Sequence, residues 1–187
     1  MEQEPLVYQN VDSELLTETV WETLMKDLNG IKSKTLVVLN PKASSENALR
    51  NWDLWGPLFI CLILSTVLAI TAPVGQTTLL FTGVFIILTI GGAIVSINFM
   101  LLGSTVSFFQ AICAIGYCLF PIACGSLITA ILSWTIIKVI TVPLTLVWSI
   151  HSVSRFIASH ISEDRKLLGL FPCGLLYTVI SWITLIH

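Results

Sequence analysis

His151 is the residue whose type is best suited to chemistry, because its imidazole lies in an apolar run where an ionisable group is a functional candidate. Ser152 and Ser154 lie beside it, and Arg155 follows one helical turn later. A Ser–His hydrolase would also need an orienting group and an oxyanion hole, and the sequence holds no Gly-x-Ser-x-Gly stretch. We therefore expect His151 to be a hydrogen-bonded packing residue near a membrane surface. A contact of His151 and Arg155 with a lipid headgroup or a partner is one alternative, and a catalytic role is the other.

The five cysteines are the remaining potential ligands or nucleophiles, and none of them is paired as Cys-x-x-Cys. They are Cys61, Cys113, Cys118, Cys124 and Cys173. All lie in apolar runs, where a buried thiol behaves as a small apolar side chain. Cys113 and Cys124 share a helix face, but no histidine accompanies them on that run. We expect no metal site, no cofactor and no enzymatic activity.

The composition indicates that lipid is the main solvent of this protein. Of its 187 residues, 55% are hydrophobic and only 11% are charged, whereas a soluble domain carries about 25% charged residues. After Asp53 the next charged side chain is Lys138, so residues 54–137 carry no charge. The net charge of −2 argues against nucleic acid as a partner, because no basic patch is available to release counterions.

The charge-free stretch is about four times the ~20 residues that one membrane-spanning helix needs, so the chain must cross several times. Turn signals such as "APVGQT" and "LLGSTVS" divide residues 51–187 into five apolar runs. The expected spans are about 57–73, 78–100, 108–132, 139–157 and 167–186. Open strands are excluded because lipid leaves their edges unpaired, and the runs lack the alternation of barrel strands. The predicted fold is all-α, a polytopic bundle of five transmembrane helices with a short cytosolic N-terminal amphipathic helix.

The distribution of Lys and Arg predicts the orientation of the bundle. Five spans place the N-terminal segment and the loops after the second and fourth spans on one side. That side holds Lys26, Lys32, Lys34, Lys42, Arg50, Arg155, Arg165 and Lys166, and the other side holds Lys138. The positive-inside rule therefore puts the N-terminus in the cytosol and the C-terminus in a lumen.

Residues 1–50 form the predicted cytosolic segment, and about 13–29 within it have the periodicity of an amphipathic helix. Its polar face is acidic, whereas a helix adsorbed by anionic lipid would be basic. We therefore favour a protein partner or packing on the cytosolic loops, with Trp21 and Asp27 as contact candidates. A solvated linker helix that only spaces the chain is the alternative.

The stretch "DLWGP", residues 53–57, stands where the charged segment meets the first apolar run. It comprises Asp53, Leu54, Trp55, Gly56 and Pro57. Tryptophan suits the headgroup layer, and proline fits a first helical position because it lacks an N–H that would have no partner there. An ordinary membrane-entry cap is the expected role, and docking of a partner at Asp53 is the alternative.

The third run carries a second unusual stretch, "GYCLFP", residues 116–121. Pro121 in mid-span removes a backbone hydrogen bond and predicts a kink. Gly116 allows a neighbouring backbone to approach closely, and Tyr117 must find an acceptor within the bundle. A packing kink is the expected role, and a hinge or a lipid-accessible groove is the alternative.

"DLWGP" at the start of the first span and "GYCLFP" in the third together resemble the Yip family of Ypt/Rab-GTPase-interacting membrane proteins. "LMKDLNGIKSKTLVVLNPK" and "GSTVSFFQAICAIGYCLFP" are similar to the family's short Golgi subgroup, the member usually numbered six in animals, as is the closing "LLYTVISWITLIH". The resemblance covers roughly residues 20–187. It implies residence in Golgi and ER membranes, a part in vesicle transport, contact with prenylated Rab-type GTPases, and hetero-oligomers with a sister Yip or Yif protein.

The expected function is that of a non-enzymatic membrane adaptor in ER–Golgi vesicle transport and Golgi organisation. Its expected partners are the lipid bilayer, Rab-type GTPases and other Yip or Yif proteins. His151, Arg155, Arg165 and Lys166 join Trp21 and Asp27 as candidates for cytosolic contacts. A small channel or transporter and a purely structural subunit remain as alternatives.

Overall fold

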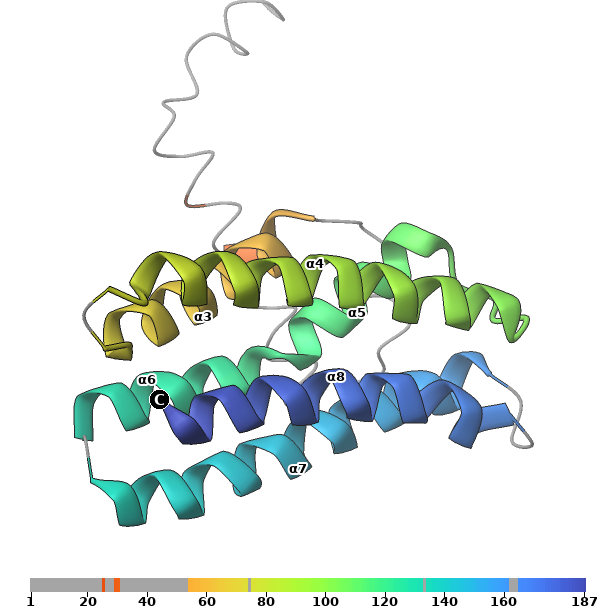
Figure 1. Ribbon diagram of the computed structural model, residues 1–187. Coiled ribbons are helices and arrows are strands. Elements are labelled where there is room, and N and C mark those ends of the chain that lie inside the picture. The colour runs from red at the N-terminus through yellow and green to blue at the C-terminus, as the bar shows by residue number, and fades with distance from the viewer. Residues whose placement is uncertain (1–24, 26–28, 31–53, 74, 133, 162–164) are drawn as a thin grey trace, which may run out of the picture.

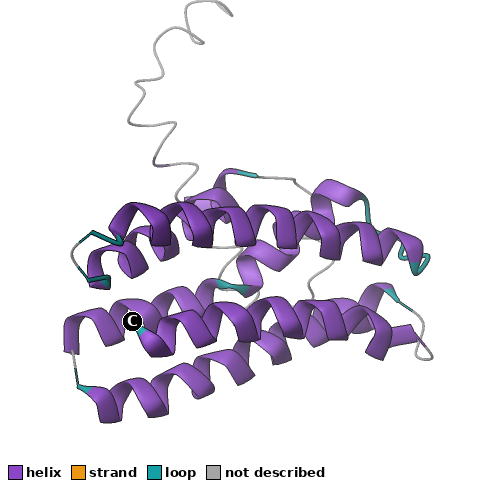
Figure 2. Ribbon diagram, viewed as in Figure 1, coloured by secondary structure: helices purple, strands orange, loops and turns teal. Residues whose placement is uncertain are grey.

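The computed structural model describes Met25, Asn29, Gly30 and residues 54–73, 75–132, 134–161 and 165–187. Trp21, Asp27, Asp53 and nearly all of the predicted helix at 13–29 lie outside the described residues. The described part of the chain is helical and contains no strand, so the predicted all-α class is confirmed (Figure 2).

Six helices form the described bundle. They are α3 (Trp55–Thr71), α4 (Thr77–Leu101), α5 (Phe108–Cys118), α6 (Phe120–Leu132), α7 (Thr135–His160) and α8 (Lys166–Ile186). Four helical stretches are long and apolar enough to cross a membrane, with α5 and α6 counted as one, and α3 is a shorter apolar helix of 17 residues. The predicted polytopic bundle of five helices is therefore confirmed.

The helices lie in two layers with α5 between them (Figure 1). The helices α3 and α4 lie side by side in one layer, and α6, α7 and α8 lie in the other. The helix α5 runs obliquely from the first layer toward the second and contacts α3, α4 and α7. The core between the layers includes Leu64, Leu88, Phe99, Ile115, Leu119 and Tyr177.

The outward faces of the helices are also apolar, which agrees with a lipid solvent. Large exposed side chains occur on every helix of the bundle, among them Ile63, Ile94, Phe109, Ile131, Leu144 and Trp182. Buried serine and threonine side chains donate to carbonyl groups of their own helices where hydrogen bonds are observed. Ser96 Oγ, for example, donates to the Gly92 carbonyl at 2.8 Å.

The start of α3 differs from the expectation for "DLWGP". The helix begins at Trp55, so Gly56 is already helical and Pro57 is the third helical residue. Proline is tolerated there because the first four N–H groups of a helix have no partner within it. The cap residue is Leu54, and it makes no side-chain cap hydrogen bond.

The first helix is also short relative to its neighbour. The tight connection after Thr71 aligns the end of α3 with the start of α4, which has 25 residues against 17 in α3. At ~1.5 Å per residue, the start of α3 therefore lies about 12 Å short of the end of α4. Figure 1 shows α3 covering only part of the length of α4.

Two contacts identify which loops share an end of the bundle. Arg165 Nη1 donates to the Leu102 carbonyl at 3.3 Å, which joins the start of α8 to the end of α4. Lys138 Nζ donates to the His187 carbonyl at 2.5 Å, which joins the start of α7 to the end of the chain. The α4–α5 and α7–α8 connections therefore lie at one end, which we name the Arg165 end. Lys138 and His187 lie at the opposite end.

Gly103 turns the chain at the Arg165 end. Its φ of +76° is left-handed, a region that glycine adopts without strain. The Gly103 N–H bonds to the Met100 carbonyl and the Ser104 N–H to the Phe99 carbonyl, which is the Schellman pattern of a helix end. Arg165 satisfies the adjacent Leu102 carbonyl, so this end of α4 is closed by backbone and side chain together.

Candidate functional site

The two stretches that stand out in the sequence meet in the structure. A Cβ atom placed on Gly116 would lie 2.5 Å from Pro57 Cβ, and one placed on Gly56 would overlap the Tyr117 hydroxyl. Both glycines therefore allow α3 and α5 to approach more closely than any side chain would permit. Tyr117 is 1% exposed, so its ring fills the junction between the two helices. We name these four residues the α3–α5 junction.

The predicted kink lies immediately beside this junction. The helix α5 ends at Cys118 and α6 begins at Phe120, so the third span breaks at Leu119, two residues before Pro121. Pro121 has no N–H to offer the Tyr117 carbonyl, and the Leu119 N–H bonds to the Gly116 carbonyl instead of continuing the regular ladder. The break therefore frees the carbonyl of Ile115 from its usual partner four residues on.

Tyr177 supplies the missing donor. Its hydroxyl donates to the Ile115 carbonyl at 2.8 Å, across from α8 to α5, and its side chain is fully buried. A neighbouring helix that satisfies a broken helix is expected where no water is available. Tyr177 is not among the residues that stand out in the sequence, although a tyrosine in a wholly apolar span needs a hydrogen-bond acceptor.

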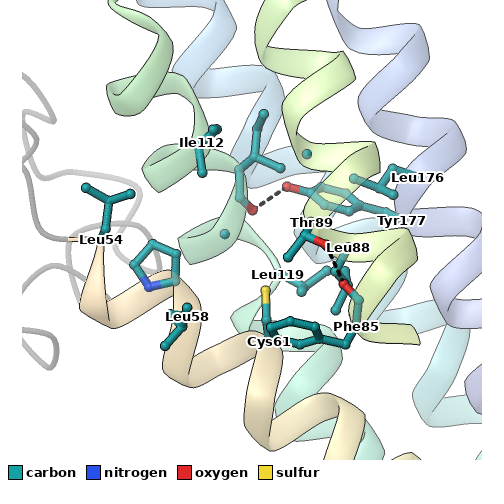
Figure 3. A pocket seen from close by; sticks show the side chains of 14 residues that line it. Leu54, Leu58, Cys61, Phe85, Leu88, Thr89, Ile112, Leu119, Leu176 and Tyr177 are labelled. Carbon is teal, nitrogen blue, oxygen red and sulfur yellow. Dashed lines mark hydrogen bonds between the residues drawn. The ribbon is translucent and has the colours of Figure 1, made fainter. Parts of the chain in front are cut away.

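A cavity of about 260 Å³ adjoins the junction, between α3, α4, α5 and α8 (Figure 3). Leu54, Pro57 and Leu58 line it from the start of α3. Four residues line it from the middle of α4, namely Phe85, Leu88, Thr89 and Gly92. Only three lining residues carry a side-chain heteroatom, namely Cys61, Thr89 and Tyr177. The cavity is therefore an apolar space within the membrane-spanning part of the bundle.

The candidate residues of "DLWGP" and "GYCLFP" divide between the cavity and its surroundings. Leu54, Pro57 and Gly116 line the cavity, and Gly56 and Tyr117 lie in the α3–α5 junction. Trp55 is 62% exposed and its ring lies 6.0 Å from that of Phe59, on the outward side of α3. Pro121 is buried in α6 and does not line the cavity.

The candidates for cytosolic contacts do not join this site. His151 is exposed on α7, which differs from the packing role expected for it. Arg155 is partly buried four residues further along the same helix. Arg165 is exposed at the Arg165 end, and Lys166 beside it is partly buried.

The cysteines are free thiols distributed over α3, α5, α6 and α8. The described residues contain no group of three or more His, Cys, Asp or Glu side chains that could hold a metal ion. Cys61 is the only cysteine that lines the described cavity.

Comparison with known proteins places the chain in a family. The Yip1 domain model matches residues 35–183. The Protein YIPF6 homolog of Dictyostelium discoideum is 39% identical over 92% of this chain and 95% of its own length. Protein YIPF6 of Xenopus tropicalis is 36% identical over 95% of this chain and 79% of its own length. Protein YIP4b of Arabidopsis thaliana is 36% identical over 90% of this chain, which spans 61% of that protein. No solved structure matches the chain. The chain is therefore a multi-pass membrane protein that belongs to the Yip family.

Proposed function

We propose that this protein is a non-enzymatic membrane adaptor in ER–Golgi vesicle transport, which contacts Rab-type GTPases and associates with sister Yip or Yif proteins. The observation that carries the proposal is the match to the Yip1 domain over residues 35–183, together with the similarity to YIPF6 proteins over most of the chain. In the proposed orientation the Arg165 end faces the cytosol and the chain ends in the lumen of the Golgi or ER. Arg155, Arg165 and Lys166 near that end support this orientation by the positive-inside rule.

The outward face of α7 is the proposed surface for a sister protein. Leu144, Val147, Trp148 and His151 are all exposed along this face. His151 lies seven residues before Ala158, where the candidate membrane span ends, which is about 10 Å along the helix. An ionisable side chain exposed to hydrocarbon at such a depth is costly. A transmembrane helix of a sister protein would remove this cost by offering His151 a hydrogen-bond partner.

Co-isolation in mild detergent tests this surface. We expect His151→Leu to reduce the recovery of the sister protein with the full chain, because the leucine keeps the apolar area and loses the polar contact. Thr82→Leu is the matched control, since Thr82 is a polar residue exposed on α4. Equal recovery with both variants would reject the α7 surface.

The GTPase contact is tested separately. Residues 12–50 and the loop 163–166 are proposed as its platform, with Trp21, Asp27, Arg165 and Lys166 as contacts. We expect the full chain in mild detergent to retain a prenylated Rab-type GTPase more strongly than the unprenylated form, and Trp21→Ala to weaken retention. If neither form is retained above the level of an unrelated membrane protein, the GTPase part of the proposal is wrong.

A further inference from the structure

We propose that the cavity beside the α3–α5 junction holds the end of a phospholipid acyl chain that enters sideways from the bilayer. The inference depends on the membrane placement of the bundle and does not depend on the adaptor function. The contents of the cavity, its depth and its mouth each support this occupant.

The polar groups of the cavity leave little for water to bind. The Thr89 hydroxyl donates to the Phe85 carbonyl at 2.8 Å, and the Tyr177 hydroxyl donates to the Ile115 carbonyl at 2.8 Å (Figure 3). An enclosed water needs two to four polar partners, and an apolar cavity without them stays dry. A dry void forfeits the dispersion contacts of its lining. Hydrocarbon can restore those contacts, and it is already the solvent at this depth.

Gly92 shows that the space is large enough for added carbon atoms. It is buried and lines the cavity, yet a Cβ atom placed on it would meet nothing within 4 Å. Its neighbour Gly91 is different, because a Cβ atom there would lie 2.5 Å from a methyl group of Leu176. One glycine of the pair therefore allows α4 to pack on α8, and the other leaves the cavity unfilled.

The depth of the cavity matches one leaflet. Gly92 lies nine residues before the end of α4 at Leu101, which is about 14 Å along the helix. Half of a hydrocarbon core of ~30 Å is ~15 Å, so the end of an acyl chain from that leaflet reaches this level. A whole helix with its side chains is ~10–12 Å in diameter and does not suit a cavity of 260 Å³.

Among the described residues, the exposed edge of the cavity lies at the start of α3. The helix α3 starts about 12 Å short of the Arg165 end, and Leu54 and Leu58 at its start are 47% and 44% exposed. Thr89 on the facing part of α4 is exposed too. The entrance is therefore lateral and apolar, and it lies toward the leaflet at the Arg165 end.

Photolabelling in nanodiscs tests the proposal with the full chain. The probe is phosphatidylcholine with a diazirine at the end of one acyl chain, and labelled residues are mapped by mass spectrometry. We expect labels on cavity-lining residues of α4 and α8 as well as on the outward faces. Gly92→Leu should lower cavity labelling roughly tenfold, because leucine fills the space that the acyl chain would need.

Gly83→Leu is the matched control for this variant. Gly83 is on the same helix, a Cβ atom there also meets nothing within 4 Å, and it does not line the cavity. We expect its cavity labelling to equal that of the unmodified chain. A second pair protects against failure of Gly92→Leu to fold: Cys61→Leu should also lower cavity labelling, whereas Cys124→Leu should not, because only Cys61 lines the cavity.

Several results would overturn the inference. Cavity labelling that persists at full strength in both Gly92→Leu and Cys61→Leu would show that the label does not come from this space. Labels confined to outward faces would show that no acyl chain enters. Displacement of the cavity label by a geranylgeranylated cysteine peptide, but not by unlabelled phosphatidylcholine, would assign the cavity to a prenyl chain instead.

Discussion

Pro57 and Gly116 lie so close that the absence of a single side-chain atom decides how α3 and α5 pack. The Cβ of an alanine at 116 would be 2.5 Å from Pro57 Cβ and 3.1 Å from Pro57 Cα. The proline ring and backbone are stiff, so the helices would have to separate. Gly56 and Tyr117 reproduce the same relation one residue along each helix. The α3–α5 junction therefore locks the short first helix against the broken third span.

Gly116→Ala should accordingly destabilise the protein by about 1–3 kcal/mol, the usual cost of overpacking. The intrinsic helix preference of alanine opposes this by about 0.5–1 kcal/mol. A net loss of stability would therefore show that the cost of overpacking exceeds the helix preference. Gly174→Ala is the control, because a Cβ atom at 174 meets nothing within 4 Å and only the helix preference remains. Thermal unfolding in detergent would measure both. A variant at 116 as stable as that at 174 would contradict the close packing.

At the level of whole helices, the broken span shows what a sequence can and cannot indicate. Pro121 predicts a kink, and the break at Leu119 agrees with it. The partner of the freed carbonyl could not be predicted, because Tyr177 is 62 residues away from Ile115 and the pairing depends on how α8 packs on α5. A lipid-accessible groove was the alternative role for residues 116–121, but the lining of the cavity could not be predicted, since four helices contribute to it. His151 illustrates a third case: its type drew attention, but only the structure shows its exposure on α7.

Tyr177→Phe should lower the free energy of unfolding by about 1 kcal/mol, because the Ile115 carbonyl loses its donor away from water. In the Pro121→Ala background the cost should be smaller. Alanine restores the missing N–H and favours a continuous helix, in which the Leu119 N–H would serve Ile115. Thr178→Val is the control in both backgrounds, because the Thr178 hydroxyl bonds only within α8, to the Gly174 carbonyl at 2.7 Å. Chemical unfolding of the unmodified chain, the two single variants and the double variant measures the coupling between Tyr177 and Pro121. An identical cost of Tyr177→Phe in both backgrounds would show that Pro121 is not the reason why the Ile115 carbonyl lacks its partner within the helix.

For the molecule as a whole, the class of fold followed directly from the distribution of charge. A run from 54 to 137 without a charged residue can only lie in hydrocarbon, and helices are the elements that satisfy their own backbone there. The structure also shows which loops and charged residues lie at each end of the bundle. Arg165 and Lys166 mark one end, and Lys138 marks the other through its bond to His187. Since antiparallel packing fixes which loops share an end, one measured loop orients all the others.

Single cysteines in two exposed loop positions test the orientation. Thr105 lies in the connection between α4 and α5, at the Arg165 end, and Gln76 lies just before α4, at the opposite end. In sealed microsomes a membrane-impermeant maleimide should label Thr105→Cys from the cytosolic side and leave Gln76→Cys unlabelled. Detergent should then expose Gln76→Cys, and the unmodified chain supplies the background from its own largely buried thiols. If Gln76→Cys alone were labelled before detergent, the bundle would have the opposite orientation. The GTPase platform would then have to lie at the Lys138 end.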